Sequence, residues 1–252
     1  MTSKELIIFD LDGTLALSKS SIDEEMALLL EKLLTKYKVI VVSGGKFKQF
    51  ETQLIDHLRL SKENSVNFYI EPGSGSSMYK FVNDDTIEMY ADVLNHEEKD
   101  KIMEALNYAL DKANFHPVEN TLGEIIEDRV SQITFSALGQ NASLSEKKLW
   151  DPDHRKREEI IKYLNEKIPE FEVHMGGTTS IDVTKKGRDK AYGIRKASEY
   201  LGIPIEKILF VGDALYPGGN DEPAIKSGVE CIQVKDIEDT KRVIKEILAE
   251  EA

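Results

Sequence analysis

The sequence predicts an α/β fold in which a doubly wound, mostly parallel core is interrupted by an α+β cap domain. Near both ends of the chain, short apolar runs alternate with helical periods, which is typical of parallel strands joined by crossover helices. The middle of the chain instead has two helical segments among several strand-like pieces. We therefore expect residues 1–83 and 188–252 to form the core and residues 84–187 to form the cap.

The core elements can be placed in order along the chain. Before the cap we expect a strand at 6–9, a helix at 21–36, a strand at 38–42, a helix at 46–58 and a strand at 67–70. Ser21 and Glu24 are spaced as a capping box at the start of the first helix. After the cap we expect a helix at 189–201, a strand at 208–211, a short helix, a strand near Cys231 and a closing helix from 237. This order builds a Rossmann-like sheet.

The cap elements have a different rhythm. A strand-like piece at 78–82, still in the core, is followed by another at 86–90. The cap then continues with a helix at 96–114, paired strands at 124–127 and 130–136, a helix at 153–167, and strands at 171–175 and 180–184. Such closely spaced strands are expected to pair antiparallel.

The acidic composition limits the classes of partner. The 33 basic and 46 acidic residues leave a formal charge of −13, which repels nucleic acid and anionic membranes. The sequence has no targeting pattern and no apolar run long enough to span a bilayer. We expect a cytoplasmic protein that binds a small molecule.

Two carboxylates follow the first predicted strand. Asp10 and Asp12 are two residues apart, so in an extended chain their side chains leave the backbone on the same side, and Gly13 lets the chain turn after them. Close carboxylates are favourable when a hard cation such as Mg²⁺ lies between them. The alternative is an ordinary strand-ending turn, in which Asp-Gly is common.

Other polar residues are predicted at the same edge of the sheet. Ligands of an open parallel sheet bind at the carboxyl ends of its strands. There or close by lie Ser43 with Gly44, Asp213 with the following Asn220 and Asp221, and Lys190. Singly, these residues could be a turn, a helix cap or a solvated lysine; together they indicate a phosphate site.

These motifs resemble those of the haloacid dehalogenase superfamily of phosphotransferases. The likeness rests on residues 10–14, Ser43, Lys190 and Asp213 with its acidic loop, and the insert looks like a type IIB cap. Within the superfamily the chain is most similar to the eukaryotic-type phosphomannomutase group, through residues 176–183, 187–190 and 217–221. The likeness covers nearly the whole chain.

The resemblance implies a role for each motif residue. Asp10 would be the nucleophile, and Asp12 would act first as general acid and then as general base. Mg²⁺ would be held by Asp10, Asp213 and the backbone carbonyl of Asp12, with Asn220 and Asp221 nearby. The expected contacts to the phosphoryl group come from Thr14, Ser43, Gly44 and Lys190.

The cap is expected to close over the site and select the substrate. Arg129, Ser180 and Asp182 match cap ligands of the phosphomannomutase group. Lys19 in the core, and Gln140 and Lys147 (or Lys148) in the cap, stand where that group has arginines. A glutamine amide suits sugar hydroxyls better than a phosphate. The basic run at 154–157 could compensate or be a solvated helix face.

On this basis the sequence favours a Mg²⁺-dependent phosphatase that hydrolyses a sugar phosphate, such as the hexose 6-phosphate mannose 6-phosphate, through an aspartyl-phosphate. The alternative is a phosphohexomutase that interconverts hexose 1- and 6-phosphates through a 1,6-bisphosphate. A non-catalytic sugar-phosphate-binding protein is the third reading. The resemblance also implies a homodimer formed through the cap.

Overall fold

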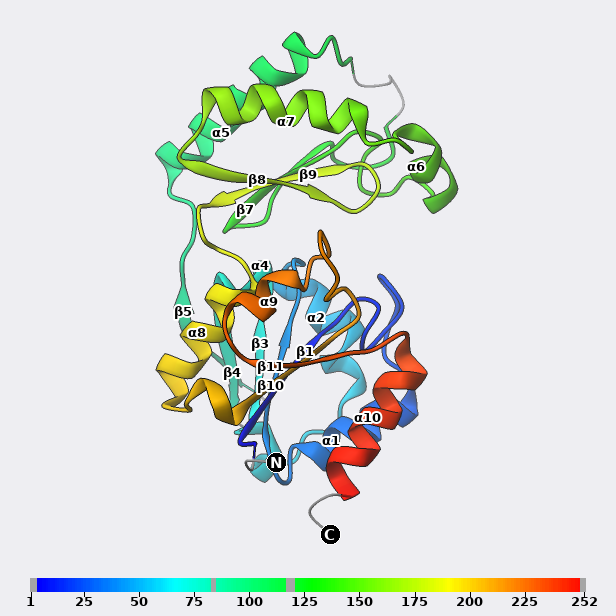
Figure 1. Ribbon diagram of the computed structural model, residues 1–252, viewed down its shortest axis with the longest axis vertical. Helices are drawn as coiled ribbons and strands as arrows, with labels where there is room; N and C mark the ends of the chain where they lie inside the picture. Colours follow the sequence, from blue (N-terminus) through cyan, green and yellow to red (C-terminus); the bar gives the residue numbers. More distant parts are fainter. Residues whose placement is uncertain (1–3, 83–84, 117–120, 250–252) are drawn as a thin grey trace. The chain divides into compact units, whose positions relative to one another are not determined.

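The chain folds into two compact units. The computed structural model describes residues 4–82, 85–116 and 121–249. The first unit, which we call the core, contains the chain up to Ala91 and from Arg188 onward, and the second, the cap, runs from Asp92 to Gly187 (Figure 1). In the described residues no helix is both long and apolar enough to cross a membrane.

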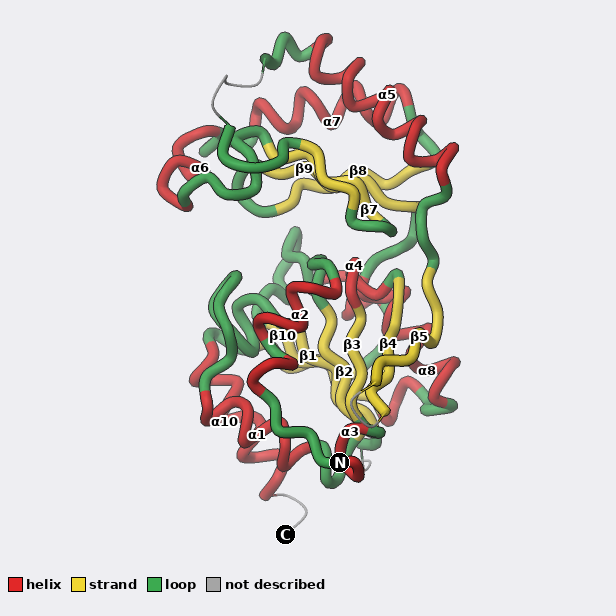
Figure 2. The backbone as a smooth tube through the Cα atoms, turned by 180° about the vertical axis from the view of Figure 1, so that it is seen from behind, coloured by secondary structure: helices red, strands yellow, loops and turns green. Residues whose placement is uncertain are grey.

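A single mixed sheet runs through the core. Its strands are β1 (Leu6–Asp10), β2 (Lys38–Val42), β3 (Phe68–Glu71), β4 (Ser77–Val82), β5 (Asp85–Ala91), β10 (Ile208–Gly212) and β11 (Glu230–Gln233). They lie in the order β11-β10-β1-β2-β3-β4-β5, in which β4 is antiparallel to both β3 and β5 and all other pairings are parallel. Figure 2 shows this order from β10 to β5. Asp10 pairs in register with Val42, so the carboxyl ends of β1 and β2 lie side by side.

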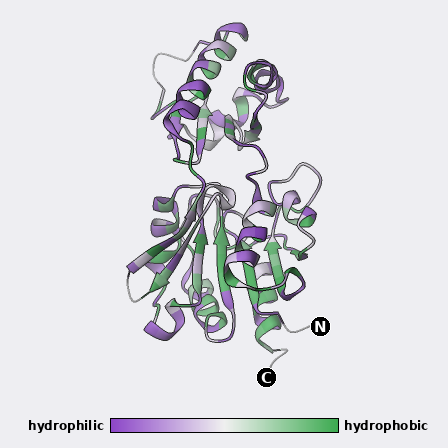
Figure 3. Ribbon diagram, turned by 90° about the vertical axis from the view of Figure 1, so that its left-hand side faces the viewer, coloured by the Kyte–Doolittle hydropathy of each residue, from purple (hydrophilic) through white to green (hydrophobic). Residues whose placement is uncertain are grey.

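Helices cover both faces of the core sheet. Alternate residues of β1 point to opposite faces, and all are buried. Helices α1 (Glu24–Leu33), α2 (Phe47–Gln53) and α10 (Ile237–Ala249) pack on the face that contains Phe9. Helices α8 (Lys190–Leu201) and α9 (Glu222–Lys226) pack on the face that contains Ile8. The central strands are accordingly apolar, whereas the helices contain both polar and apolar residues (Figure 3). Short helical turns complete this unit: η1 (Ile55–His57), α3 (Lys62–Ser65), α4 (Pro72–Gly75) and η2 (Ile205–Lys207).

The cap has its own sheet and its own hydrophobic core. Strands β6 (Ile126–Asp128), β7 (Gln132–Ser136), β8 (Phe171–Gly176) and β9 (Ser180–Lys185) pair antiparallel in the order β6-β7-β9-β8. Helices α5 (His96–Lys112) and α7 (Arg155–Lys167) pack on one face of this sheet, against residues such as Phe135 and Ile181. A short helix, α6 (Leu144–Trp150), precedes α7.

The α/β fold class is confirmed, but several local expectations differ from the structure. Helix α1 starts at Glu24 and is capped by Asp23, whose Oδ1 accepts from the Met26 N–H at 2.8 Å. Ser21, the predicted cap, donates instead to the carbonyl of Thr52 at 3.2 Å. The second predicted helix is divided into α2 and η1, and α6 was not expected.

The boundary between core and cap also differs from the expected one. A division after residue 83 assigns β5 to the cap, whereas β5 pairs with β4 at the edge of the core sheet. A strand's local sequence does not specify which sheet it joins, because edge pairing is decided by the partner strand. The division at Gly187 is where the sequence analysis expected it.

Candidate active site

The carboxyl end of β1 places Asp10 in a buried polar environment. Asp10 is 1% exposed, and its Oδ1 accepts a hydrogen bond from the Lys190 ammonium at 2.5 Å. The same ammonium donates to Asp221. The bonds connect three separate segments of the chain at one edge of the sheet, where ligands of such folds bind.

Helix α8 brings Lys190 into this site. Asp189 caps the helix by accepting from the Tyr192 N–H at 2.9 Å, which holds the first helical turn, and Lys190 is the first helical residue. Lys190 is 3% exposed. A buried ammonium is favourable only with charged partners, and Asp10 and Asp221 supply them.

Burial and charge shift the pKa values at the centre. Burial raises the pKa of Asp10 to about 7; the Lys190 charge opposes that rise and the Asp221 charge adds to it. Burial alone would lower the pKa of Lys190, but Asp10 and Asp221 raise it above its ordinary value. Lys190 therefore stays cationic at neutral pH and can neutralise part of the charge of a phosphoryl group.

Three carboxylates form a candidate metal site. Asp10, Asp213 and Asp221 each offer an oxygen, and these oxygens lie within 4.8 Å of one another. Asp10 Oδ2 is buried and has no hydrogen-bond partner among the described residues. Burial and then the Asp221 charge raise the pKa of Asp213. An orphaned buried oxygen among repelling carboxylates fits the ligand preference of a hard divalent cation.

The turn after β1 is built closely around this cluster. Gly13 has φ +98°, and a Cβ at this position would lie 2.7 Å from Asp213 Oδ2. Thr14 is fully buried and its hydroxyl donates to Asp213 Oδ1 at 3.2 Å. Both the backbone conformation and the space therefore require glycine at position 13.

The Asp12 carboxylate is outside the acidic cluster. Its Oδ2 accepts from Gln49 Nε2 at 2.7 Å, and its Oδ1 accepts from the Lys19 backbone N–H at 2.9 Å. The predicted metal contact concerned the Asp12 backbone carbonyl and stays a prediction. Gln49 was not expected from the sequence, where a glutamine on a short helix carries no chemical signal.

Ser43 lies at the end of β2, next to the end of β1. It is 4% exposed, and its Oγ accepts from the Gly45 N–H at 3.2 Å. Gly44 follows it directly, so backbone N–H groups are present where the sequence analysis expected phosphate contacts. These contacts remain predictions.

Two of the predicted site residues lie outside the buried centre. Lys19 and Asn220 are both exposed, although the Lys19 backbone contacts Asp12. Asp221, which was expected only near the metal, is completely buried and forms part of the carboxylate cluster itself. The Ala214 N–H donates to Asp221 Oδ2 at 3.0 Å and holds it there.

The cap sheet has a polar row on the face opposite its helices. Pairing of β7 with β9 places Thr134 opposite Asp182 and Ser136 opposite Ser180. The Thr134 hydroxyl donates to Asp182 at 2.8 Å, and the two serine hydroxyls are 3.1 Å apart. Gln140 Nε2 donates to Ser136 Oγ at 3.0 Å. We call these five residues the polar row.

Two cations border the polar row. Arg129 Nε pairs with Glu127 at 2.8 Å, and its charge opposes the burial that raises the pKa of Asp182. Lys147 Nζ donates to the backbone carbonyl of Gln140 at 2.8 Å. Each of these two cations is therefore linked to one member of the polar row, Arg129 through its charge on Asp182 and Lys147 through the Gln140 carbonyl.

The basic run at 154–157 is not a uniformly solvated face. Arg157 is 2% exposed and pairs with Asp151 at 2.8 Å. Its Nη1 donates to the carbonyls of Gly176 and Gly177 at 2.9 and 2.8 Å. Arg157 therefore supports the β8–β9 turn and is committed to structure.

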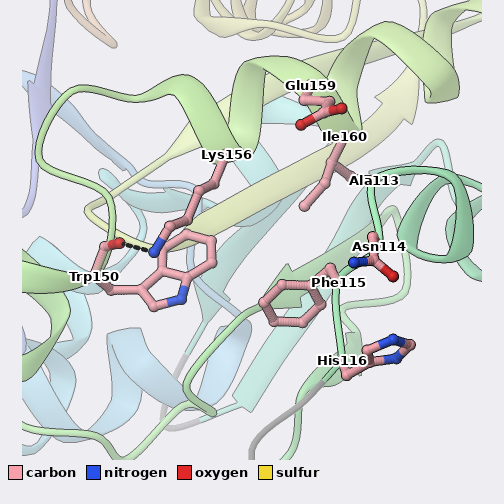
Figure 4. Close-up of a pocket in the computed structure, with 8 residues that line it drawn as sticks. All are labelled: Ala113, Asn114, Phe115, His116, Trp150, Lys156, Glu159 and Ile160. Carbon is pink, nitrogen blue, oxygen red and sulfur yellow. Dashed lines mark hydrogen bonds between the residues drawn. The ribbon is translucent and has the colours of Figure 1, made fainter.

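The cap also contains a cavity of about 390 Å³. Phe115, Trp150 and Lys156 line it, with the Lys156 ammonium donating to the Trp150 carbonyl (Figure 4). None of the predicted site residues lines this cavity.

The fold and the site together define a class of enzyme. A parallel sheet with a paired Asp motif after β1, a buried lysine from a later helix and an acidic loop after β10 identify an enzyme of the haloacid dehalogenase superfamily. The family model for eukaryotic phosphomannomutase matches residues 26–250. The chain belongs to the eukaryotic phosphomannomutase family.

Curated relatives match along almost the entire chain. A probable phosphomannomutase of Caenorhabditis elegans is 27% identical and covers 99% of this chain and 97% of its own length. A phosphomannomutase of Encephalitozoon cuniculi is 30% identical, with 97% and 94% covered. Human phosphomannomutase 1 is 26% identical, with 86% and 81% covered.

Solved structures share the fold. The C-terminally truncated IMP-nucleotidase of Plasmodium falciparum has a TM-score of 0.76 at 19% identity, covering 98% of this chain and 72% of its own. The C-terminal domain of Candida albicans trehalose-6-phosphate phosphatase has a TM-score of 0.65 at 16% identity, covering 98% and 93%. At these identities the likeness concerns the fold alone.

Proposed function

We propose that this enzyme transfers a phosphoryl group on a hexose phosphate and interconverts hexose 1- and 6-phosphates. The family match carries this proposal, because residues 26–250 include the whole cap as well as most of the core. The curated relatives described above are named phosphomannomutases. Hydrolysis of a hexose 6-phosphate, the reaction favoured from the sequence, becomes the second candidate.

The core residues would divide the chemistry between them. An Asp10 oxygen attacks phosphorus, the bond between phosphorus and the sugar oxygen breaks, and an aspartyl-phosphate forms. Asp12 gives its proton to the departing sugar oxygen and later takes a proton from the next attacking hydroxyl. When that hydroxyl belongs to a hexose monophosphate, a hexose 1,6-bisphosphate forms and Asp10 is regenerated.

The remaining centre would stabilise charge on the transferring group. Lys190 supplies a fixed cation beside Asp10, and Ser43, Gly44 and Thr14 would orient the phosphoryl oxygens. Mg²⁺ held by Asp10, Asp213 and Asp221 would draw charge from the phosphoryl group and favour the ionised form of Asp10.

The polar row would recognise the sugar. A bisphosphate intermediate carries a second phosphate that needs cationic contacts away from the reacting one. Arg129 acts on Asp182 of the polar row, Lys147 contacts the Gln140 carbonyl, and these two cations could meet this need. This pair of cations supports the mutase.

One observation favours the hydrolase as a second candidate. Gln140, at a position where the phosphomannomutase group has an arginine, brings no charge and directs its amide to Ser136. Arg129 is already paired with Glu127. A cap with few cationic side chains near the polar row suits a hexose monophosphate, which presents only hydroxyls there, better than a hexose bisphosphate, which presents a second phosphate.

One assay distinguishes the two reactions. The enzyme is incubated with Mg²⁺ and hexose 1- or 6-phosphate, with and without the hexose 1,6-bisphosphate, and both isomer and free phosphate are followed. Interconversion that depends on the bisphosphate, with little phosphate release, would support the mutase. Rapid release without the bisphosphate would overturn it in favour of the hydrolase. Asp10→Asn, as the control, should abolish both products.

The sequence also led to predictions about oligomeric state and cellular location. A homodimer formed through the cap and a cytoplasmic location both remain predictions, to be checked by the mass of the protein in solution and by its localisation.

A further inference from the structure

The Asp12 carboxylate is oriented by a side chain from a neighbouring helix. Gln49, on α2, donates from Nε2 to Asp12 Oδ2 at 2.7 Å. The other oxygen, Oδ1, accepts from the Lys19 N–H at 2.9 Å. Gln53 Nε2 is 3.4 Å from Oδ1 but forms its shorter bond, of 2.6 Å, with the Ser20 carbonyl. Gln49 is therefore the main side-chain partner of Asp12.

Gly45 provides the space that Gln49 occupies. A Cβ at position 45 would lie 1.9 Å from Gln49 Oε1 and 2.6 Å from its Cδ. Gly45 does not have a positive φ, so its backbone conformation does not require glycine. The three atoms nearest to such a Cβ all belong to Gln49, so a side chain at position 45 would have to displace Gln49.

A carboxamide suits a residue that must both give and take a proton. Through Nε2 it donates to Asp12 Oδ2, and that oxygen can accept both in the carboxylate form and when the proton to be transferred is on the other oxygen. Gln49 can thus hold Asp12 in one orientation in both halves of the reaction.

We propose that Gln49 is the positioning residue of the general acid–base Asp12 and that the absence of a side chain at Gly45 makes room for it. The inference rests on the proposed function of Asp12. Its consequence is specific: loss of Gln49 impairs proton delivery to the departing oxygen as the bond between that oxygen and phosphorus breaks. The binding of the phosphate is unaffected.

The dependence on the leaving group tests this role. Phenyl phosphate and p-nitrophenyl phosphate are mixed with excess full-length enzyme and Mg²⁺, and the phenol released in the first half-reaction is followed. Phenolate needs a proton much more than p-nitrophenolate does. We expect Gln49→Met to slow release from phenyl phosphate about tenfold or more, and from p-nitrophenyl phosphate less than about threefold.

A substitution at Gly45 should break the contact between Gln49 and Asp12 without changing either residue. Gly45→Ala should displace the Gln49 carboxamide and produce the same difference between the two esters. Because both changes break one contact, the double variant should lose no more than either single variant. Lys48→Met, at an exposed neighbouring position on α2, should behave as the parent.

The outcomes separate the inference from the proposed function. An equal loss with both esters, or no loss with either, would overturn the role of Gln49 in an enzyme that is otherwise active. A parent enzyme that cleaves neither ester and also neither interconverts nor hydrolyses hexose phosphates would contradict the proposed function and this inference together.

Discussion

A substitution at Gly13 should affect both the stability of the fold and the binding of Mg²⁺. Gly13→Ala should destabilise the fold by about 1–2 kcal/mol, because alanine disfavours a positive φ. It should also weaken Mg²⁺ binding, because the new Cβ would collide with the Asp213 carboxylate. Urea unfolding and calorimetric Mg²⁺ titration would measure the two effects.

A substitution at Gly202 serves as a control that separates the effect on stability from the effect on Mg²⁺ binding. Gly202 also has a positive φ, but a Cβ there would meet nothing within 4 Å. Gly202→Ala should therefore lower stability and leave Mg²⁺ affinity unchanged. Equal Mg²⁺ affinity in both variants would mean that Gly13 does not shape the metal site.

A buried carboxyl outside the reaction predicts a pH dependence of stability. Glu71, at the end of β3, is 1% exposed, and burial raises its pKa from 4.5 to about 8 against the opposing effect of the Tyr90 hydroxyl. The folded state thus holds a proton that the unfolded chain releases. The stability that this proton supplies is complete below pH 4.5 and is lost as the pH rises toward about 8.

Replacement by glutamine should remove that pH dependence. Relative to the parent, Glu71→Gln should gain unfolding free energy as the pH rises, with a slope of up to about 1.4 kcal/mol per pH unit. Urea unfolding at several pH values would measure the difference. A difference that is constant with pH would show that Glu71 titrates normally.

At the scale of elements, a buried arginine on α7 forms an ion pair and connects the helix to the cap sheet. Arg157 contacts Asp151 and two carbonyls of the β8–β9 turn, which leads into Ser180. Arg157→Met should destabilise the protein by about 3–5 kcal/mol, because it leaves the Asp151 carboxylate buried and unpaired. Thermal and urea unfolding would measure the loss.

Two further variants test whether the loss of stability in Arg157→Met comes from the broken ion pair. Arg155→Met, two residues away and exposed, should change stability little. Asp151→Leu combined with Arg157→Met should cost less than the sum of the single changes, since the pair acts as a unit. Additive losses would show that the two side chains contribute independently.

At the scale of the whole molecule, the two units have separate hydrophobic cores. Phe135 is fully buried in the cap and packs edge-on against Phe115 at 5.5 Å between ring centres. Phe135→Ala should cost about 3–5 kcal/mol of local stability. Hydrogen exchange should then increase within residues 92–187 and leave β1 and β2 protected.

A matched variant in the core should reverse that pattern. Phe210 on β10 is equally buried, in the core unit. Phe210→Ala should increase exchange in the core strands and spare α5 and α7. If either change increased exchange throughout the chain, the two units would have to unfold as one.

The sequence by itself determined the kind of molecule. Apolar runs, helical periods and the carboxylates after β1 are local patterns, and the rules of parallel sheets bring strand ends to one edge. These were enough to predict the α/β class, the interrupted core and a group of polar residues at one edge of the sheet. They also identified the superfamily, which the family match bears out. The roles of Asp10, Lys190 and Asp213 come from the family resemblance and stay predictions.

Only the tertiary structure decided which residues complete the site. Lys190 and Asp10 are 180 positions apart, and Gln49 is 37 positions from Asp12. Gln49 and Glu71 have no local signal, because a glutamine on a helix or a glutamate at a strand end is ordinary until the fold surrounds it. Contacts between distant segments depend on how helices and turns pack, and no local pattern encodes that packing.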